Sequence, residues 1–459
     1  MAHLLVTLAV QPRGIFVGWR LNDVEFDVGD CLGQLPVFVA GTPSVDLKAD
    51  DIAASDGLGA LDLRMSLREG DEGELLKVWE VGRSTRGPVD VSYLARPITE
   101  PPTAATPPLD LRAEGVGICG ALKCLLVLPP GPENLTFELH WNPPEREGGP
   151  GSWLAVSSLG EGIGSEGQLV GEGLEFLADT YVMCGELADR HYRDGQLSTW
   201  WLAPTGVDIE SFTARLGATY RVMSQTFDAP EHPYRVFLRT HPHRGATASA
   251  HPASFAMAVN PVHPPDIGAV HETIAHELVH EWLRLDGPAE EVTWFVEGAA
   301  DYYSLVLPLR SGMIDDDAFL RAVNTEAREA YANPRRGLSL RDAQREFFSD
   351  FLAHRLPYAR GMFYLADLDS RSSGKPRPAS PSTMSSETSC EPVARANGSA
   401  LRHGVTESER SSATTRCRRS MPWSSPVPGG PTKTASVPDS PWTGSTYRSS
   451  TWDGTLRHW

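Results

Sequence analysis

The first third of the chain alternates apolar and polar residues with the period of a β-strand. Residues 4–10, 15–21 and 89–95 follow this pattern most regularly, and clusters of Gly, Pro, Asp and Asn separate them. Many short strands at this spacing are typical of a β-sandwich. The sequence therefore predicts a β-sandwich-like N-terminal domain over residues 1–165. The same alternation predicts further strands over residues 35–40, 60–67, 76–81, 123–129, 135–141 and 152–159.

The pattern changes after a glycine-rich stretch at residues 160–173. Residues 208–227 have helical periodicity, with Asp208 as the N-cap, and nearly every segment after Asp266 is helical in pattern. A mixed sheet followed by helices is an α+β arrangement, which we assign to a second domain over residues 166–370. The strands expected here, of which the first two form a pair, occupy residues 174–187, 196–204, 234–240 and 254–260.

Acidic residues outnumber basic ones, at 59 Asp and Glu against 41 Lys and Arg, which gives a net charge of −18. This surplus argues against a nucleic-acid-binding protein, because phosphate contacts need a basic face. Residues 1–14 lack the basic run of a secretory signal, and no apolar run approaches the length of a membrane span. We therefore expect a cytoplasmic protein that binds neither nucleic acid nor membrane. Its oligomeric state is left open.

Residues 371–459 differ in composition from the rest of the chain. They are rich in Ser, Thr, Pro and Arg, carry a local surplus of basic residues, and contain few large aliphatic residues. Such a segment buries too little apolar surface to offset its ordering entropy, so we expect it to be disordered. A second interpretation is a non-native reading frame or an alternative end, because the helical pattern of residues 362–371 runs into it without a cap.

The candidate chemistry is concentrated in the segment His-Glu-Leu-Val-His at residues 276–280. On a helix, His276 and His280 project from one face, close enough to bind one tetrahedral zinc ion. Glu277 is angled toward the open coordination position, where it can accept a proton from a water whose pKa zinc lowers to about 7. An ordinary surface helix with two histidines is the alternative interpretation of so short a motif.

A second predicted helix, over residues 291–307, supplies two carboxylates four residues apart. Glu297 can complete a set of two histidines and one glutamate around zinc, which leaves one position for water. Asp301, one turn further on, can hold the second ring nitrogen of a ligand histidine and so fix its tautomer. Solvated helix charges are the alternative, but Trp294 and Phe295 make these surroundings apolar, and a carboxylate in an apolar setting usually has a partner.

The segments HELVHEW and WFVEGAADYY, which begin at His276 and Trp294, together resemble the gluzincin metallopeptidases. The likeness extends to the glycyl-aminopeptidase family, whose members often carry a PDZ domain, and to the aminopeptidase N and leukotriene hydrolase group. It covers residues 170–370 best. The resemblance implies a thermolysin-like catalytic domain, a peptide or protein substrate, and one Zn2+ ion per chain held by His276, His280 and Glu297.

In these families a tyrosine in a Tyr-x-Lys/Arg-Gly segment at a helix start assists the oxyanion. The residues Tyr358-Ala-Arg-Gly361 match that segment, about sixty residues after Glu297. Pro357 suits the first position of a helix. The resemblance implies that Tyr358 donates to the developing oxyanion, as preorganised donors do, and a core tyrosine on a helix is the alternative.

The substrate-strand signature of the aminopeptidase N group, Gly-x-Met-Glu-Asn, is absent from this sequence. Its place is taken by residues 253–260, where we expect Ala256, Met257 and Ala258 to pair with a peptide backbone by strand addition. Glu272, on the same helix as the two histidines, is a further candidate substrate contact, with a solvated charge as its alternative. Because the segment lacks the glutamate that binds a free N-terminal amine, the choice between exo- and endopeptidase stays open.

The predicted function is a zinc-dependent metallopeptidase, aminopeptidase-like, in which metal-activated water attacks a peptide carbonyl. Glu277 is the predicted general base and later proton donor, Tyr358 stabilises the oxyanion, and Asp301 orients a ligand. One alternative is a hydrolase of a non-peptide substrate such as an epoxide, as in one relative of the group. The other is a catalytically impaired, zinc-bearing binding scaffold, because the helical region that follows in the family is not visible after Ser370.

Overall fold

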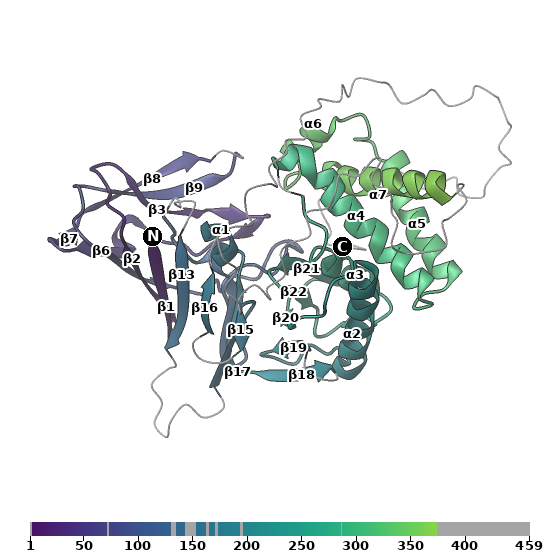
Figure 1. Cartoon of the computed structure of the whole chain (residues 1–459), viewed down its shortest axis with the longest axis horizontal. Coiled ribbons are helices and arrows are strands. Elements are labelled where there is room, and N and C mark those ends of the chain that lie inside the picture. The colour runs from purple at the N-terminus through teal and green to yellow at the C-terminus, as the bar shows by residue number, and fades with distance from the viewer. Residues whose placement is uncertain are drawn as a thin grey trace, which may run out of the picture. The chain divides into compact units, whose positions relative to one another are not determined.

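The computed structural model in Figure 1 has a β-rich N-terminal part, a second sheet with a helix beside it, and a set of helices toward the C-terminus. This order confirms the predicted α+β class. The tail expected over residues 371–459 lies outside the described residues, except that residues 371–373 end the last helix. The structure describes residues 2–70, 73–129, 135–142, 153–161, 165–169, 173–192, 196–285 and 287–373.

The N-terminal part is built from three main sheets, with strand orders β16-β13-β1-β2-β10-β6-β7, β11-β12-β17-β14-β15 and β3-β9-β8. In β1 the buried Leu4, Val6 and Leu8 alternate with partly exposed residues, as the period-two pattern predicts. The elements are β1 His3–Gln11, β2 Gly14–Asn22, β3 Cys31–Pro36, β4 Phe38–Val39, β5 Thr42–Pro43, β6 Ile52–Asp56, β7 Gly59–Leu61, β8 Leu63–Glu69, β9 Leu75–Val81, β10 Val89–Ala95, β11 Arg112–Glu114, β12 Gly117–Ala121, β13 Thr136–Asn142, β14 Trp153–Ser157, β15 Gly160–Glu161, β16 Ser165–Leu169, α1 Gly173–Ala178 and β17 Tyr181–Glu186.

One predicted strand of this part is wrong. Residues 124–129 are buried and Lys123 is half-buried, but the segment forms the end of a short 3-10 turn and an irregular stretch. Side chains satisfy part of its backbone: the Trp19 indole N–H donates to the carbonyl of Val127 at 2.8 Å, and the Tyr93 hydroxyl donates to the carbonyl of Leu125 at 2.9 Å. Leu128 makes only an isolated bridge, to Gln34. A continuous apolar run indicates burial, and it does not determine how the backbone hydrogen bonds are made.

The expected domain boundary at residue 165 does not coincide with a break between sheets. Strand β16 pairs with β13, and β17 lies between β12 and β14, so the N-terminal sheets continue to Glu186. The predicted strand pair over 174–187 and 196–204 is therefore divided differently. Residues 173–178 form α1, and the hydrogen-bonded pair is β18 Ala188–Tyr192 with β19 Leu197–Trp201.

The second part has one five-stranded sheet, in the order β18-β19-β20-β22-β21, with β20 Tyr234–Thr240, β21 Ala246–His251 and β22 Ser254–Val259. Helix α2, Ile209–Thr226, precedes β20, and the Asp208 carboxylate accepts the N–H of Ser211 as the expected N-cap. Apolar residues of α2, the sheet and the following helices share one core. None of the helices in the described ranges is both long enough and apolar enough to cross a membrane.

Five helices follow: α3 His271–Val279, α4 Ala289–Arg310, α5 Asp316–Tyr331, α6 Leu340–Arg345 and α7 Phe351–Ser373. Their ends differ from expectation in three places. Helix α3 begins five residues after Asp266, whose carboxylate instead accepts the N–H of Gly268 in a turn. Helices α4 and α7 both contain a proline, Pro308 and Pro357, that we expected at an end. Leu356 and Ala359, on either side of Pro357, are fully buried, so tertiary packing outweighs the local cost of proline.

Candidate metal centre

The two histidines of the H-E-L-V-H segment lie one turn apart at the end of α3. His280 follows the last helical residue but keeps helical dihedral angles, with φ −61° and ψ −16°, so its ring stays on the same face as that of His276. The ring centroids are 4.9 Å apart, and the two Nε2 atoms are 3.2 Å apart. Seven of the eight residues from Thr273 to His280 are buried, which places the motif on the inner side of the helix.

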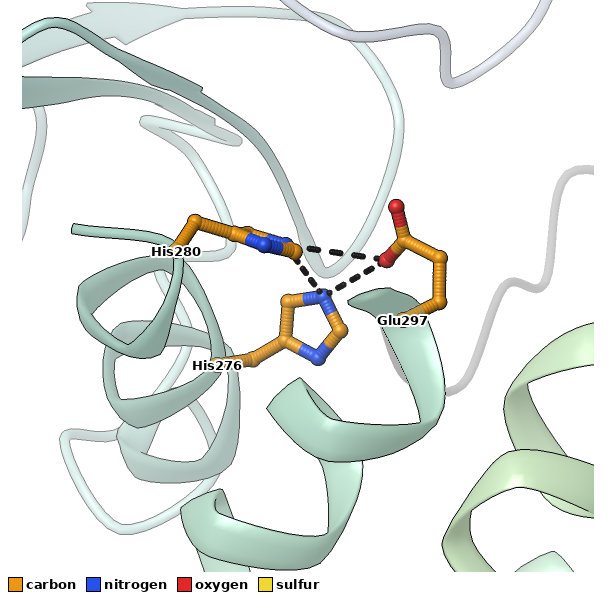
Figure 2. Close-up of side chains that lie close together, drawn as sticks. All are labelled: His276, His280 and Glu297. Atoms are coloured by element: carbon orange, nitrogen blue, oxygen red, sulfur yellow. Dashed lines mark hydrogen bonds and ion pairs between the residues drawn. The ribbon is translucent and has the colours of Figure 1, made fainter. Parts of the chain in front are cut away.

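Glu297 brings its carboxylate to the same point from α4 (Figure 2). Its Oε2 atom lies 3.2 Å from Nε2 of His276 and 3.6 Å from Nε2 of His280. One ligand atom from each of the three residues falls within 4.8 Å of the others. The structure thus brings together the three residues that the sequence assigns to a metal, although they come from two helices.

Asp301, one turn after Glu297 on α4, holds the other side of the His276 ring. The Nδ1–H group of His276 donates to Oδ1 of Asp301 at 2.7 Å, and both side chains are buried. Because this bond fixes the proton on Nδ1 in the neutral ring, the lone pair of Nε2 points toward Glu297 and His280. The structure therefore shows the contact that we expected for Asp301.

The electrostatics of this group fit a bound cation. Burial disfavours the charged forms of His276 and Glu297, but the attraction between opposite charges is stronger. Asp301 and Glu297 hold the pKa of His276 well above its usual value. His280 and His276 hold the pKa of Glu297 well below its usual value. A divalent cation would take the place of the Nε2 proton of His276, since both need the same lone pair. Two imidazole nitrogens and one carboxylate are a donor set that suits Zn2+.

Glu277 is buried beside the two histidines. Burial raises the pKa of its carboxyl group, and the neighbouring His276 and His280 act in the opposite direction. A carboxylate with a raised pKa is better matched to taking up and releasing a proton near neutral pH. Its position and environment therefore suit a general base.

Tyr358 reaches the same place from α7. Its ring stacks on that of His276, with centroids 5.9 Å apart and planes at 18°, and on that of His354 at 5.1 Å. Burial and the nearby Glu297 hold the pKa of Tyr358 well above its usual value. The phenol therefore stays protonated at neutral pH, as a hydrogen-bond donor must.

A glycine contact lets α4 and α7 approach closely enough to juxtapose these groups. A Cβ atom added to Gly298 would lie 2.3 Å from the Cα of Gly361, and one added to Gly361 would lie 1.9 Å from the carbonyl oxygen of Trp294. These distances are far too short, so only glycine fits at both positions. Gly298 follows Glu297 directly and Gly361 lies one turn after Tyr358, so the contact sets the distance between ligand and tyrosine.

Two expected substrate contacts have different surroundings from those predicted. Strand β22 is paired on one edge with β20 and on the other with β21, and Ala256, Met257 and Ala258 are buried. The expectation that these residues offer a free strand edge is therefore wrong. The two edge strands of the sheet are β18 and β21, and β21 contacts α3. Glu272 is half-buried near Asp301 and Arg355, and burial raises its pKa to about 7.

Sequence reasoning missed Arg355. Its guanidinium is buried on α7, 3.6 Å from Oδ2 of Asp301 and 4.6 Å from the centre of the Tyr358 ring. The one signal in the sequence was an arginine three residues before Tyr358 on an otherwise largely apolar segment, since an arginine that becomes buried needs a carboxylate partner. Nothing in the spacing along the chain connects it to Asp301, which precedes it by more than fifty residues.

Residues 286–359 match the family of M61 glycyl aminopeptidases. Among solved structures, the chain is similar to an aminopeptidase N family protein from Idiomarina loihiensis, with 16% identity and a TM-score of 0.58 over 80% of this chain and 66% of that one. It is also similar to yeast LTA4 hydrolase, solved in complex with bestatin, with 14% identity and a TM-score of 0.47 over 80% of this chain and 58% of that one. The sequence has no significant match among the curated proteins.

These similarities differ in what they establish. At 16% identity, the likeness to the Idiomarina loihiensis protein shows a shared fold, and the chain spans only 66% of that protein's length. The matched segment 286–359 contains Glu297, Asp301 and Tyr358, which are part of the group described above. The resemblance to gluzincin peptidases is thus confirmed, and over this segment the chain is similar to the M61 glycyl aminopeptidases.

Proposed function

We propose that this protein is a zinc-dependent peptidase that hydrolyses peptide bonds with an aminopeptidase-like preference. The observation that carries the proposal is the convergence of His276, His280 and Glu297 within 4.8 Å, with Glu277 buried beside them. The match to a peptidase family over residues 286–359 supports the reaction class. His276, His280 and Glu297 would hold one Zn2+ ion, which when bound supplies Lewis-acid activation of water and of the substrate carbonyl.

The residues of the chain supply the proton transfers and the orientation. Glu277 takes a proton from the attacking water and later delivers it to the nitrogen of the leaving amine, so no proton is gained or lost overall. The Tyr358 hydroxyl donates a hydrogen bond to the carbonyl oxygen as this atom gains negative charge. Asp301 keeps the His276 ring in the tautomer and orientation that a ligand needs, through the 2.7 Å bond to Nδ1.

The peptide substrate would lie along β21. This strand is at the edge of its sheet and contacts α3, so an extended peptide that added to the sheet there would run past the two histidines. Backbone pairing of this kind places a peptide bond without selecting its side chains, and it explains how the fold can bind a peptide although the Gly-x-Met-Glu-Asn signature is absent.

The variant Glu277→Gln tests this function. Replacing the carboxylate removes the proton acceptor but leaves all three metal ligands, so we expect unchanged zinc content and a loss of about 10²–10⁴-fold in kcat. Metal analysis would be run beside a panel of fluorogenic aminoacyl and peptide substrates. The matched control is Glu281→Gln on the next glutamate, which forms an ion pair with His232 at 3.2 Å and should retain activity.

Full activity of Glu277→Gln would refute the mechanism. Zinc at one ion per chain in the wild-type protein, without turnover of any substrate in the panel, would refute the peptidase function and leave a zinc-binding scaffold or a hydrolase of a non-peptide substrate.

A further inference from the structure

Arg355 lies at the centre of a buried ionic cluster behind the metal centre. Its Nη2 atom donates to Oε1 of Glu326 on α5 at 2.7 Å, and its Nε atom donates to Glu329 one turn further on the same helix. The side chains of Arg355 and Glu326 are 6% and 2% exposed, so the pair is almost completely removed from water. Charges are buried in this way only at a large desolvation cost, and good geometry is needed to offset it.

The same guanidinium contacts two groups of the proposed catalytic machinery. On one side it lies 3.6 Å from Oδ2 of Asp301, whose other oxygen accepts the Nδ1–H of His276. On another side it lies 4.6 Å from the ring centroid of Tyr358, within the range of a cation–π contact. Arg355 therefore contacts both Asp301 and Tyr358, as the ligand His276 does, but Arg355 is not itself one of the proposed ligands.

Helix α5 determines where the guanidinium sits. Glu326 and Glu329 are one turn apart and fix two of its nitrogen atoms, so the planar group has little freedom to rotate. The carboxylates of α5 do not contact the metal centre. Their effect on it would pass through Arg355 to Asp301 and from there to His276.

We propose that Arg355 is a positioning residue of the metal centre, oriented by Glu326 and Glu329, which holds the Asp301 carboxylate against His276 and the Tyr358 ring in place. The proposal has two halves. That Arg355 positions Tyr358, the Tyr358 half, rests on the proposed function. That Arg355 positions Asp301, the Asp301 half, requires only that the three ligands bind a metal ion.

The first test measures zinc affinity by competition with a chelator at fixed pH. Arg355→Met alone leaves buried carboxylates without a partner and endangers folding, so the informative variant is the apolar pair Arg355→Met/Glu326→Met. We expect its zinc affinity to fall about 10-fold or more, in the range measured for residues that support a metal ligand. The control Arg371→Met removes an exposed ion pair with Asp367 on the same helix and should leave the affinity unchanged.

A double-mutant cycle of zinc affinities, which combines the Arg355→Met/Glu326→Met pair with Asp301→Asn, shows whether Arg355 acts through Asp301. If it does, the pair Arg355→Met/Glu326→Met costs about 10-fold in the wild-type background and little in the Asp301→Asn background, because the contact has already been lost. Equal losses in the two backgrounds, or wild-type affinity in the folded variant, would overturn the proposal.

Kinetics separate this inference from the proposed function. In zinc-saturated protein we expect the paired variant to lower kcat with KM nearly unchanged, because a displaced Tyr358 affects the developing oxyanion and not the bound substrate. An unchanged kcat would overturn the Tyr358 half. If the wild-type protein binds zinc but hydrolyses no substrate, the proposed function fails, while the affinity cycle still decides the role of Arg355 toward Asp301.

Discussion

Two buried arginines occupy different regions of the molecule, and their surroundings differ in kind. Arg239, on β20, donates to the carbonyl oxygens of Pro108 and Asp110 and to the carboxylate of Asp110, all in the N-terminal part of the chain. Arg355, on α7, contacts carboxylates and the ring of Tyr358. The side chains are 3% and 6% exposed, so burial alone does not distinguish them.

The two arginines differ in which groups their partners contact in turn. Asp110 also pairs with Arg112, and none of these described partners is a residue that we assign to metal binding or proton transfer. The contacts of Arg239 therefore tie the β20 sheet to the β11 region. The contacts of Arg355 lead through Asp301 to His276 within two steps. We infer that a buried ion pair marks a functional residue when its partner also orients a metal ligand or a catalytic group, and a structural one when it ends at backbone carbonyls.

The largest expected effect is on folding. Arg239→Met removes the buried donor to Oδ1 of Asp110 and to two backbone carbonyls, while Arg112 still pairs with Oδ2 of Asp110, and we expect the free energy of unfolding to fall by about 3 kcal/mol. Chemical denaturation would measure the change, with Arg20→Met as a control because its pair with Asp90 is exposed. Zinc affinity of the folded fraction should be unchanged. A loss of zinc affinity as large as that of the Arg355 variant would remove the distinction between the two regions.

A smaller effect on folding, but a strong one on activity, is expected at the contact between α4 and α7. In Gly298→Ala the new Cβ atom would lie 2.3 Å from the Cα of Gly361, so the helices must separate. Because a shift of about 1 Å in a catalytic group can cost about 100-fold, we expect kcat/KM to fall by about that factor. Gly337→Ala is the matched control, since nothing lies within 4 Å of its Cβ position. Equal activity of the two variants would show that the contact does not position Tyr358.

The effect that is smallest near neutral pH, and that grows as the pH falls, concerns a histidine where the two parts meet. His251, on β21, is fully buried and its ring Nδ1 donates to the carbonyl of Asp179; burial, with Lys123 nearby, lowers the pKa of His251 to about 3. The unfolded chain takes up this proton below pH of about 6.5, whereas the folded protein does not. Stability is therefore lost as the pH falls from about 6.5 toward 3, at about 1.4 kcal/mol per pH unit.

The variant His251→Asn measures that contribution, because the amide can still donate to the carbonyl of Asp179 but cannot be protonated in this range. Unfolding midpoints between pH 7 and pH 4 should fall less steeply than those of the wild-type protein. Identical pH profiles would show that His251 does not account for the acid sensitivity.

The comparison also shows which parts of the site the sequence could predict. His276, Glu277 and His280 share one helical turn, so local spacing alone places them together. Glu297 and Asp301 also share one face of one helix, and their approach to the histidines was inferred from chemistry and resemblance. Arg355 could not be placed in the same way, because its contact with Asp301 depends on how α7 packs on α4 and α5.

The errors in the predicted fold also arise where contacts between distant parts of the chain decide the structure. The apolar run at 123–129 has the pattern of a strand, but the side chains of Trp19 and Tyr93 supply some of its hydrogen bonds in place of a neighbouring strand. Residues 254–259 do form a strand, but only the pairing with β20 and β21 shows that it is internal. We expected Pro357 to start a helix, but helix α7 begins at Phe351. Tertiary packing stabilises the residues of α7 that precede the proline.

The sequence by itself determined the local features of this protein: strand periodicity in the N-terminal part, the N-cap at Asp208, and the spacing of the candidate ligands on two helices. Each depends on residues a few positions apart, so the backbone periods fix it. The tertiary structure decided which strand is at the sheet edge, that Gly298 meets Gly361, and that Arg355 lies between Asp301 and Tyr358. These contacts join residues far apart in the chain, and only the packing of whole elements brings them together.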